Sequence, residues 1–143
     1  MMKFRKSSRA LVLTKENKIL LIKRTKEGKE PYYVTPGGGI EKEESSQEAL
    51  IRELAEETGS VVDTIKFLFH LDDVDMKNSV DFYLVQEIER KMPTGTEWLY
   101  SNEKNKYELY EATIEELSSL NLKPDMVVSA LYHALKKELY NEE

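Results

Sequence analysis

Residues 38–60, GGIEKEESSQEALIRELAEETGS, combine a glycine turn, a helix and a concentration of glutamate, and they decide how the rest of the chain is interpreted. Ser45 followed by Glu48 forms a capping box, which predicts that a helix begins there. Gly59 after Thr58 is a typical helix stop. The stretch therefore predicts one helix that is entered through a glycine-rich turn.

The predicted helix has an apolar face and an acidic face. At about 100° per residue, Glu53, Glu56 and Glu57 share one face. Like charges at this spacing repel each other, and the only basic residue of the helix, Arg52, is better placed to pair with Glu48 one turn earlier. Uncompensated carboxylates supply the hard oxygen ligands that Mg²⁺ and Mn²⁺ require. The alternative is a solvated face of the kind that charge runs usually form.

Length and composition are those of an ordinary folded domain. With 143 residues, 40% hydrophobic and 34% charged, the chain is expected to form one domain over residues 1–143. It contains no cysteine, which excludes thiolate metal sites and redox sites. A net charge of -6 argues against a nonspecific nucleic-acid-binding protein. No apolar run is long enough to span a membrane and no export signal precedes the domain, so we expect a cytoplasmic protein.

Apolar periodicity and turn residues predict an α/β protein. The predicted strands cover residues 9–13, 18–24, 32–34, 61–71 with a bend near Asp63, 79–88 and 108–112. Residues 36–39 are predicted to form a turn, and residues 89–107 a long loop with a short strand at 98–100. A capping box at 113–116 predicts a short helix. A terminal helix is predicted from Pro124 to about Tyr140.

The stretch resembles the signature of the Nudix hydrolase family, G-x5-E-x7-R-E-U-x-E-E-x-G-U, in which U is a bulky aliphatic residue. Every specified position but the last is in register; these are Gly38, Glu44, Arg52, Glu53, Leu54, Glu56, Glu57 and Gly59. Ser60 stands where the pattern has an aliphatic residue, and Val61 follows it. Because that position packs rather than reacts, the departure concerns local packing.

The resemblance implies a fold and an activity. The implied fold is a Nudix-type α/β/α sandwich with a mixed β-sheet between helices. The implied activity is hydrolysis of a pyrophosphate bond in a nucleoside diphosphate linked to another group, with Mg²⁺ or Mn²⁺ as cofactor. The metal would neutralise the diphosphate, which a chain of charge -6 would repel, and would lower the pKa of an attacking water.

The resemblance also implies site residues, by their positions in the signature. The implied metal ligands are Glu53, Glu56, Glu57 and the carbonyl group of Gly37. Glu53 is the first choice for the general base, because it lies between the other two glutamates on the helix face. Glu44 and Arg52 would form a structural ion pair that braces the loop against the helix.

Two further residues are candidates for contacts with substrate or metal. Arg24 ends a predicted strand and can hold a phosphate, although strand alternation lets only Arg24 or its neighbour Lys23 face the site. Glu97 lies in the long loop, where some family members supply another carboxylate; a solvated loop residue is the simpler account.

The sequence leaves the substrate open. A nucleoside triphosphate or a nucleotide-sugar-like compound is the main expectation, with ADP-ribose and dinucleoside polyphosphates as alternatives. Asp75 and Met76 stand where the ADP-ribose subgroup usually has a proline, which argues mildly against that substrate. The alternative from another class is a non-catalytic nucleotide or metabolite sensor, which the complete set of glutamates disfavours. We expect a small-molecule partner, and no nucleic acid or membrane; a homodimer stays open as the commonest assembly.

Overall fold

A mixed seven-stranded sheet forms the centre of the computed structural model, which describes residues 3–96, 98, 101–123 and 128–140. Its main strand order is β3-β2-β1-β6-β5, while β4 pairs with β1 and β7 with β2. The strands are β1 (Arg5–Leu13), β2 (Ile19–Lys26), β3 (Tyr32–Val34), β4 (Gly37–Gly39), β5 (Ser60–Asp73), β6 (Asn78–Arg90) and β7 (Asn105–Ala112). The helical elements are α1 (Ser46–Glu57), the 3₁₀ helix η2 (Glu115–Ser118) and α2 (Val128–Tyr140).

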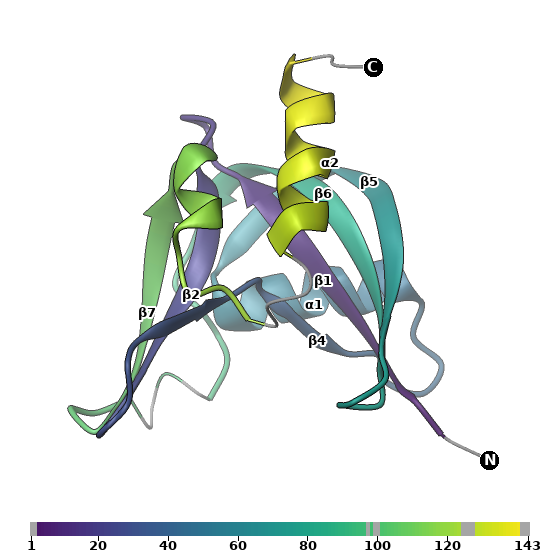
Figure 1. Ribbon diagram of the computed structural model, residues 1–143. Helices are drawn as coiled ribbons and strands as arrows, with labels where there is room; N and C mark the ends of the chain where they lie inside the picture. Colours follow the sequence, from purple (N-terminus) through teal and green to yellow (C-terminus); the bar gives the residue numbers. More distant parts are fainter. Residues whose placement is uncertain (1–2, 97, 99–100, 124–127, 141–143) are drawn as a thin grey trace.

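The sheet divides into two branches at β1. Strand β2 is paired with β1 only beside their tight turn, at Val12–Leu20 and Leu13–Ile19. Beyond that point β2 pairs with β7 and β3, while the glycine strand β4 takes its place against β1. On its other edge β1 runs parallel to β6. The branch of β2 and β7 therefore diverges from the branch of β1, β6 and β5, as Figure 1 shows.

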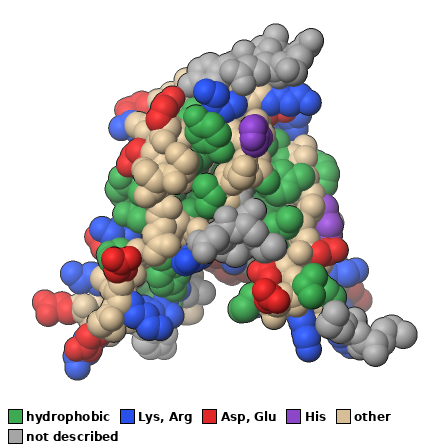
Figure 2. All heavy atoms as spheres, viewed as in Figure 1, with side chains coloured by type: hydrophobic (Ala, Val, Ile, Leu, Met, Phe, Trp, Pro, Cys, Tyr) green, Lys and Arg blue, Asp and Glu red, His purple; other side chains and the backbone are tan. Residues whose placement is uncertain are grey.

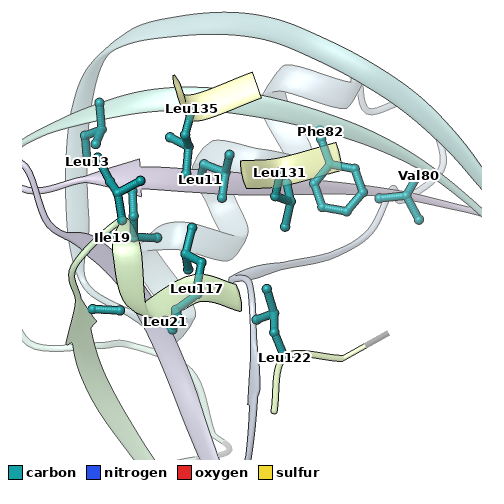
Figure 3. Close-up of a cluster of buried hydrophobic side chains, with 12 residues drawn as sticks. Leu11, Leu13, Ile19, Leu21, Val80, Phe82, Leu117, Leu122, Leu131 and Leu135 are labelled. Atoms are coloured by element: carbon teal, nitrogen blue, oxygen red, sulfur yellow. The ribbon is translucent and has the colours of Figure 1, made fainter. Parts of the chain in front are cut away.

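Helices cover both faces of the sheet, as expected for an α/β/α sandwich (Figure 1). Side chains alternate across β1: Leu11 and Leu13 pack under α2 and η2, and Ala10 and Val12 pack against α1. The larger cluster joins the sheet to both C-terminal elements (Figure 3); its buried members include Phe82, Leu117, Leu122, Leu131 and Leu135. No helix in the described ranges is long and apolar enough to cross a membrane.

Helix α1 begins and ends where its sequence predicts. The Ser45 hydroxyl accepts a hydrogen bond from the Glu48 N–H at 3.0 Å, and the Glu48 carboxylate accepts one from the Ser45 N–H at 2.9 Å, which completes the capping box. Ala49, Leu50 and Leu54 are fully buried on the apolar face. At Gly59 the backbone has a φ of +75°, and a Cβ atom there would collide with the Lys91 carbonyl group.

Ser60 belongs to a buried polar cluster that replaces the expected aliphatic contact. Its hydroxyl donates a hydrogen bond to the Glu87 carboxylate and accepts one from Thr58 at 2.8 Å. Glu87 is only 6% exposed, and Arg90 pairs with its other oxygen at 2.8 Å. Glu87 therefore explains the serine at this position of the signature, because an aliphatic residue here would leave the buried Glu87 with one hydrogen bond fewer.

Several predicted boundaries are wrong. The glycine run is a strand, β4, rather than a turn, since it pairs with β1, a segment almost thirty residues earlier in the chain. Strand β7 begins at Asn105, within the predicted loop, and Trp98 is not part of a strand. The predicted start of the terminal helix at Pro124 lies outside the described residues. The bend near Asp63 is confirmed by shifts in the β5–β6 register on both sides of Val62.

Candidate active site

Arg52 is the hub of the acidic end of α1. Its Nε and Nη2 atoms lie 2.8 Å and 3.1 Å from the two carboxylate oxygens of Glu44, and Nη2 also donates to the Gly39 carbonyl group at 3.0 Å. These hydrogen bonds keep the pKa of Glu44 below its usual range. The guanidinium group thereby holds three segments together: the loop before the helix, strand β4 and α1 itself.

The expected lack of charge compensation on the acidic face is a wrong prediction. Arg52 Nη1 lies 2.9 Å from Glu53 and 3.4 Å from Glu56, so its planar fork reaches sideways along the helix. The predicted pairing with Glu48 is not among the ion pairs of the described residues; the Glu48 carboxylate caps the helix instead. The acidic face is thus partly neutralised from one side.

Glu53 and Glu57 share a hydrogen bond on the other side of that face. Burial, followed by the hydrogen bond with Glu53, raises the pKa of Glu57 to about 9. Arg9 and the Gly37 N–H act in the opposite direction, because both favour the ionised form. Two carboxylates this close cannot both ionise easily without a cation between them. The pair therefore holds a proton at neutral pH where a metal ion would otherwise bind.

The donor set fits a hard divalent cation, although no three side chains of the types His, Asp or Glu are already arranged around one point among the described residues. Glu53 and Glu57 offer carboxylate oxygens, the ligands preferred by Mg²⁺ and Mn²⁺. A Cβ atom on Gly38 would lie 2.7 Å from the Glu53 carboxyl carbon, so this glycine lets the carboxylate lie directly against strand β4. Glu56 is more exposed, at 38% of its side chain.

The loop between β6 and β7 is fastened to the same end of α1. Its N–H groups at Thr94 and Gly95 donate to the carbonyl groups of Ala55 and Glu56, at 3.2 Å and 2.8 Å. Trp98 donates its indole N–H to the Glu57 carbonyl group at 2.9 Å. The loop is therefore part of the wall around the glutamates. Glu97, predicted as a contact from this loop, lies outside the described residues.

Arg9 is a site residue that the sequence analysis missed. It projects from β1 beside Gly37, donates Nη1–H to the Thr35 carbonyl group at 2.5 Å, and interacts electrostatically with Glu57 and Glu53. Burial lowers its pKa from a very high value. A Cβ atom on Gly37 would meet the Arg9 side chain, so glycine is required there. The available signal was an arginine at the start of the otherwise apolar predicted strand 9–13.

Two cavities lie beside Arg9, in the notch between the two branches that Figure 2 shows at the lower edge of the molecule. The first has a volume of about 250 Å³ and is lined by Arg9, Ile22, Arg24, Tyr32, Val34, Gly37, Glu57, Trp98 and Tyr107. The second has a volume of about 360 Å³ and is lined by Arg9, Val34, Leu71, Asp73, Met76, Asn78, Val80, Phe82 and Lys123. The glutamate site thus opens directly into the first cavity through Glu57.

Arg24, a predicted substrate contact, lines the first cavity. Its guanidinium carbon lies 3.8 Å from the centre of the Tyr107 ring, a close cation–π stack. Its Nε–H is buried and has no hydrogen-bond partner among the described residues. A buried donor without an acceptor is costly, and because this atom is out of contact with solvent, a ligand oxygen would reach it only if the guanidinium group moved.

Comparison with known proteins agrees with the fold. A model of the NUDIX domain matches residues 3–128. An ADP-ribose pyrophosphatase of Methanocaldococcus jannaschii is 44% identical over 50 residues, a match that spans 35% of this chain and only 30% of that protein.

Two solved structures show a similar fold at low sequence identity. A MutT NUDIX hydrolase from Burkholderia pseudomallei has a TM-score of 0.68 at 21% identity, covering 94% of this chain and 97% of that one. A UDP-X diphosphatase has a TM-score of 0.70 at 18% identity, covering all of this chain and 66% of that one. Because the family model spans most of the sequence, the chain belongs to the Nudix hydrolase family.

Proposed function

We propose that the chain hydrolyses the pyrophosphate bond of a nucleoside diphosphate linked to another group, with Mg²⁺ or Mn²⁺ as cofactor. The observation that carries the proposal is the hydrogen-bonded pair of Glu53 and Glu57, of which Glu57 lies in the wall of a cavity lined by Arg9 and Arg24. Glu53, Glu56, Glu57 and the Gly37 carbonyl group would hold the metal, which supplies charge neutralisation and an activated water.

Side chains of the protein would orient the general base and bind the phosphate oxygens. Arg52 fixes the orientation of Glu53 through the contact at 2.9 Å, so that this carboxylate is held in place to accept a proton from the attacking water. Arg9 and Arg24 offer N–H groups to phosphate oxygens on the cavity side. Trp98 forms part of the wall of this cavity beside Glu57.

Substitution of Glu53 by Gln tests this assignment. Because Gln keeps the size of the side chain but cannot take a proton, we expect kcat to fall at least about a hundredfold, with little change in the melting temperature. Glu16→Gln, in the turn between β1 and β2, is the matched control and should leave kcat unchanged. Near wild-type turnover in Glu53→Gln would move the general base to another residue.

A non-catalytic sensor is the alternative function. It predicts that nucleoside triphosphates, nucleotide sugars, ADP-ribose and dinucleoside polyphosphates release no product with either metal, while one of them binds tightly. A screen of these compounds for released phosphate-containing products, with Mg²⁺ and with Mn²⁺, separates the two functions. The ADP-ribose pyrophosphatase match supports including ADP-ribose, although Asp75 and Met76 occupy the place of the subgroup's proline.

A further inference from the structure

We propose that this site selects diphosphates that carry a bulky group at both ends over nucleoside triphosphates, and that Arg9 holds the diphosphate at the boundary between the two cavities. This inference rests on the proposed pyrophosphohydrolase function and specifies its substrate class. It is based on the shape of the notch, on the different chemistry of its two halves and on the place of Arg9 between them.

The two cavities form one divided site. Both are lined by Arg9 and Val34, and each extends under a different branch of the sheet. Binding pockets for small molecules measure about 300–1,000 Å³, so volumes of about 250 Å³ and 360 Å³ each suit one part of a nucleotide derivative. A ligand that fills both cavities has to pass Arg9.

The second cavity has the character of a nucleobase site. Its walls are largely apolar, formed by side chains that include Leu71, Val80 and Phe82. Among them Asp73, only 9% exposed, accepts a hydrogen bond from the Met76 N–H at 3.2 Å. An apolar slot with a few fixed polar atoms is the usual design for a flat heterocycle. The second cavity therefore suits the base, which all the candidate substrates possess.

The first cavity suits a second organic group better than a simple phosphate tail. Three aromatic side chains, Tyr32, Trp98 and Tyr107, share its lining with Arg24. Phosphate oxygens would pair with the Arg24 guanidinium group but would make no apolar contact with the rings, of which Tyr107 already stacks on Arg24. A sugar or a second nucleoside offers both hydroxyl oxygens for the arginine and carbon surface for the rings. The lining thus favours a group at the far end of the diphosphate.

Arg9 is placed to hold what lies between the two groups. A guanidinium group has five N–H donors, and the described contacts use one of them, on the Thr35 carbonyl group. Arg9 and Glu57 line the same cavity. A diphosphate beside Arg9 would therefore also lie beside the proposed metal ligands. The role is one of binding the diphosphate rather than of selecting between substrates, because Arg9 would contact the substrate whatever its end groups are.

The test compares substrate pairs that share a nucleoside: ADP-ribose and ADP-glucose against ATP, and UDP-glucose against UTP, with Mg²⁺ and with Mn²⁺. We expect kcat/KM of the wild-type protein to be at least about tenfold higher for the diphosphates with two end groups, the discrimination that a filled pocket supplies. Equal or higher values for the triphosphates would overturn the proposal.

Variants at residues that line each cavity test which cavity determines the preference for substrates with two end groups. Tyr107→Ala should lower kcat/KM about tenfold for the two-ended substrates and much less for the triphosphates, and Tyr107→Phe, which keeps the ring, should retain the preference. Met76→Ala, at the second cavity, should affect both classes alike, with the exposed Met92→Ala as its matched control. Equal losses for both classes in Tyr107→Ala would contradict the division of the site.

The test of Arg9 has to measure a quantity, here KM, that a purely structural role would leave unchanged. Arg9→Gln should raise KM for both substrate classes, and Arg9→Lys should recover part of the loss because it restores the charge without the fork. Unchanged KM in Arg9→Gln would contradict its proposed role. If the wild-type protein hydrolyses none of the compounds, the proposed function fails; titration calorimetry of ADP-ribose and ATP with Mg²⁺ then decides the selectivity alone, and tighter binding of ATP overturns it.

Discussion

Binding of Mg²⁺ to the metal-free protein at pH 7 is expected to release close to one proton. Glu57 holds that proton because burial and the hydrogen bond with Glu53 raise its pKa to about 9, from an ordinary value near 4.5. A group with a pKa about two units above the ambient pH is almost fully protonated. A metal ion bound by these carboxylates has to displace the proton.

The magnitude follows from this linkage. With one proton released per ion, the apparent Kd for Mg²⁺ should rise by up to about tenfold for each unit of pH lowered between pH 8 and pH 6. The raised pKa of Glu57 also makes the stability of the metal-free protein depend on pH. Since the pKa in the folded state is the higher one, the stabilisation is fully present below about pH 4.5 and is lost as the pH rises through 9.

Titration calorimetry measures the proton directly. The observed heat at pH 7 is compared in two buffers with different ionisation enthalpies, and the slope gives the number of protons released. Glu57→Gln should bring that number close to zero and weaken metal binding, while Glu16→Gln should change neither. Buffer-independent heats together with an affinity that is constant from pH 6 to pH 8 would refute the shared proton.

Three further predictions concern stability and ionisation. Ser60→Val restores the aliphatic residue of the family signature, yet it should lower the unfolding free energy by about 1–3 kcal/mol, because the buried Glu87 loses a hydrogen-bond donor; urea denaturation measures the loss, and an increase in stability would contradict it. Gly59→Ala should cost about 2 kcal/mol or more, since its φ of +75° disfavours a side chain and the Cβ would collide with a neighbouring carbonyl group; an unchanged melting temperature would be the opposite result. The pKa of His70 is raised by its hydrogen bonds to Asp81 and then Asp72, so its stabilising contribution is present below its ordinary pKa and is lost as the pH rises through the raised one; NMR titration of Asp81→Asn should show a lower midpoint for His70, and an unchanged midpoint would exclude this pairing.

Local patterns predicted the elements that local chemistry controls. The capping box at Ser45 and the stop at Gly59 fix α1 within the chain segment that contains them. The strand predicted over residues 79–88 is found within β6, and side-chain alternation along it places Phe82 and Tyr83 in the two separate core clusters. These signals need no partner from elsewhere in the sequence, which is why they could be interpreted from the sequence alone.

The missed features depend on contacts between distant segments. The glycine run becomes β4 because β2 leaves β1 after two residue pairs and exposes an edge that only a strand without side chains can approach beside Arg9. Arg52 serves Glu44 and Glu53 together because its fork reaches from the helix to the preceding loop. No periodic pattern in the sequence indicates the role of Arg9. That role becomes apparent only when the opposite walls of the cavity are known.

The hydrogen bonds that attach the β6–β7 loop to α1 affect which sequence changes the loop can tolerate. Of the four described hydrogen bonds from this loop to α1, two are donated by main-chain N–H groups, at residues 94 and 95, so these two do not depend on which side chains the loop carries. Mutation can therefore exchange the residues that face a ligand while the loop keeps its place at the end of the helix. A segment anchored in this way can change in sequence without losing its position beside the glutamates of α1.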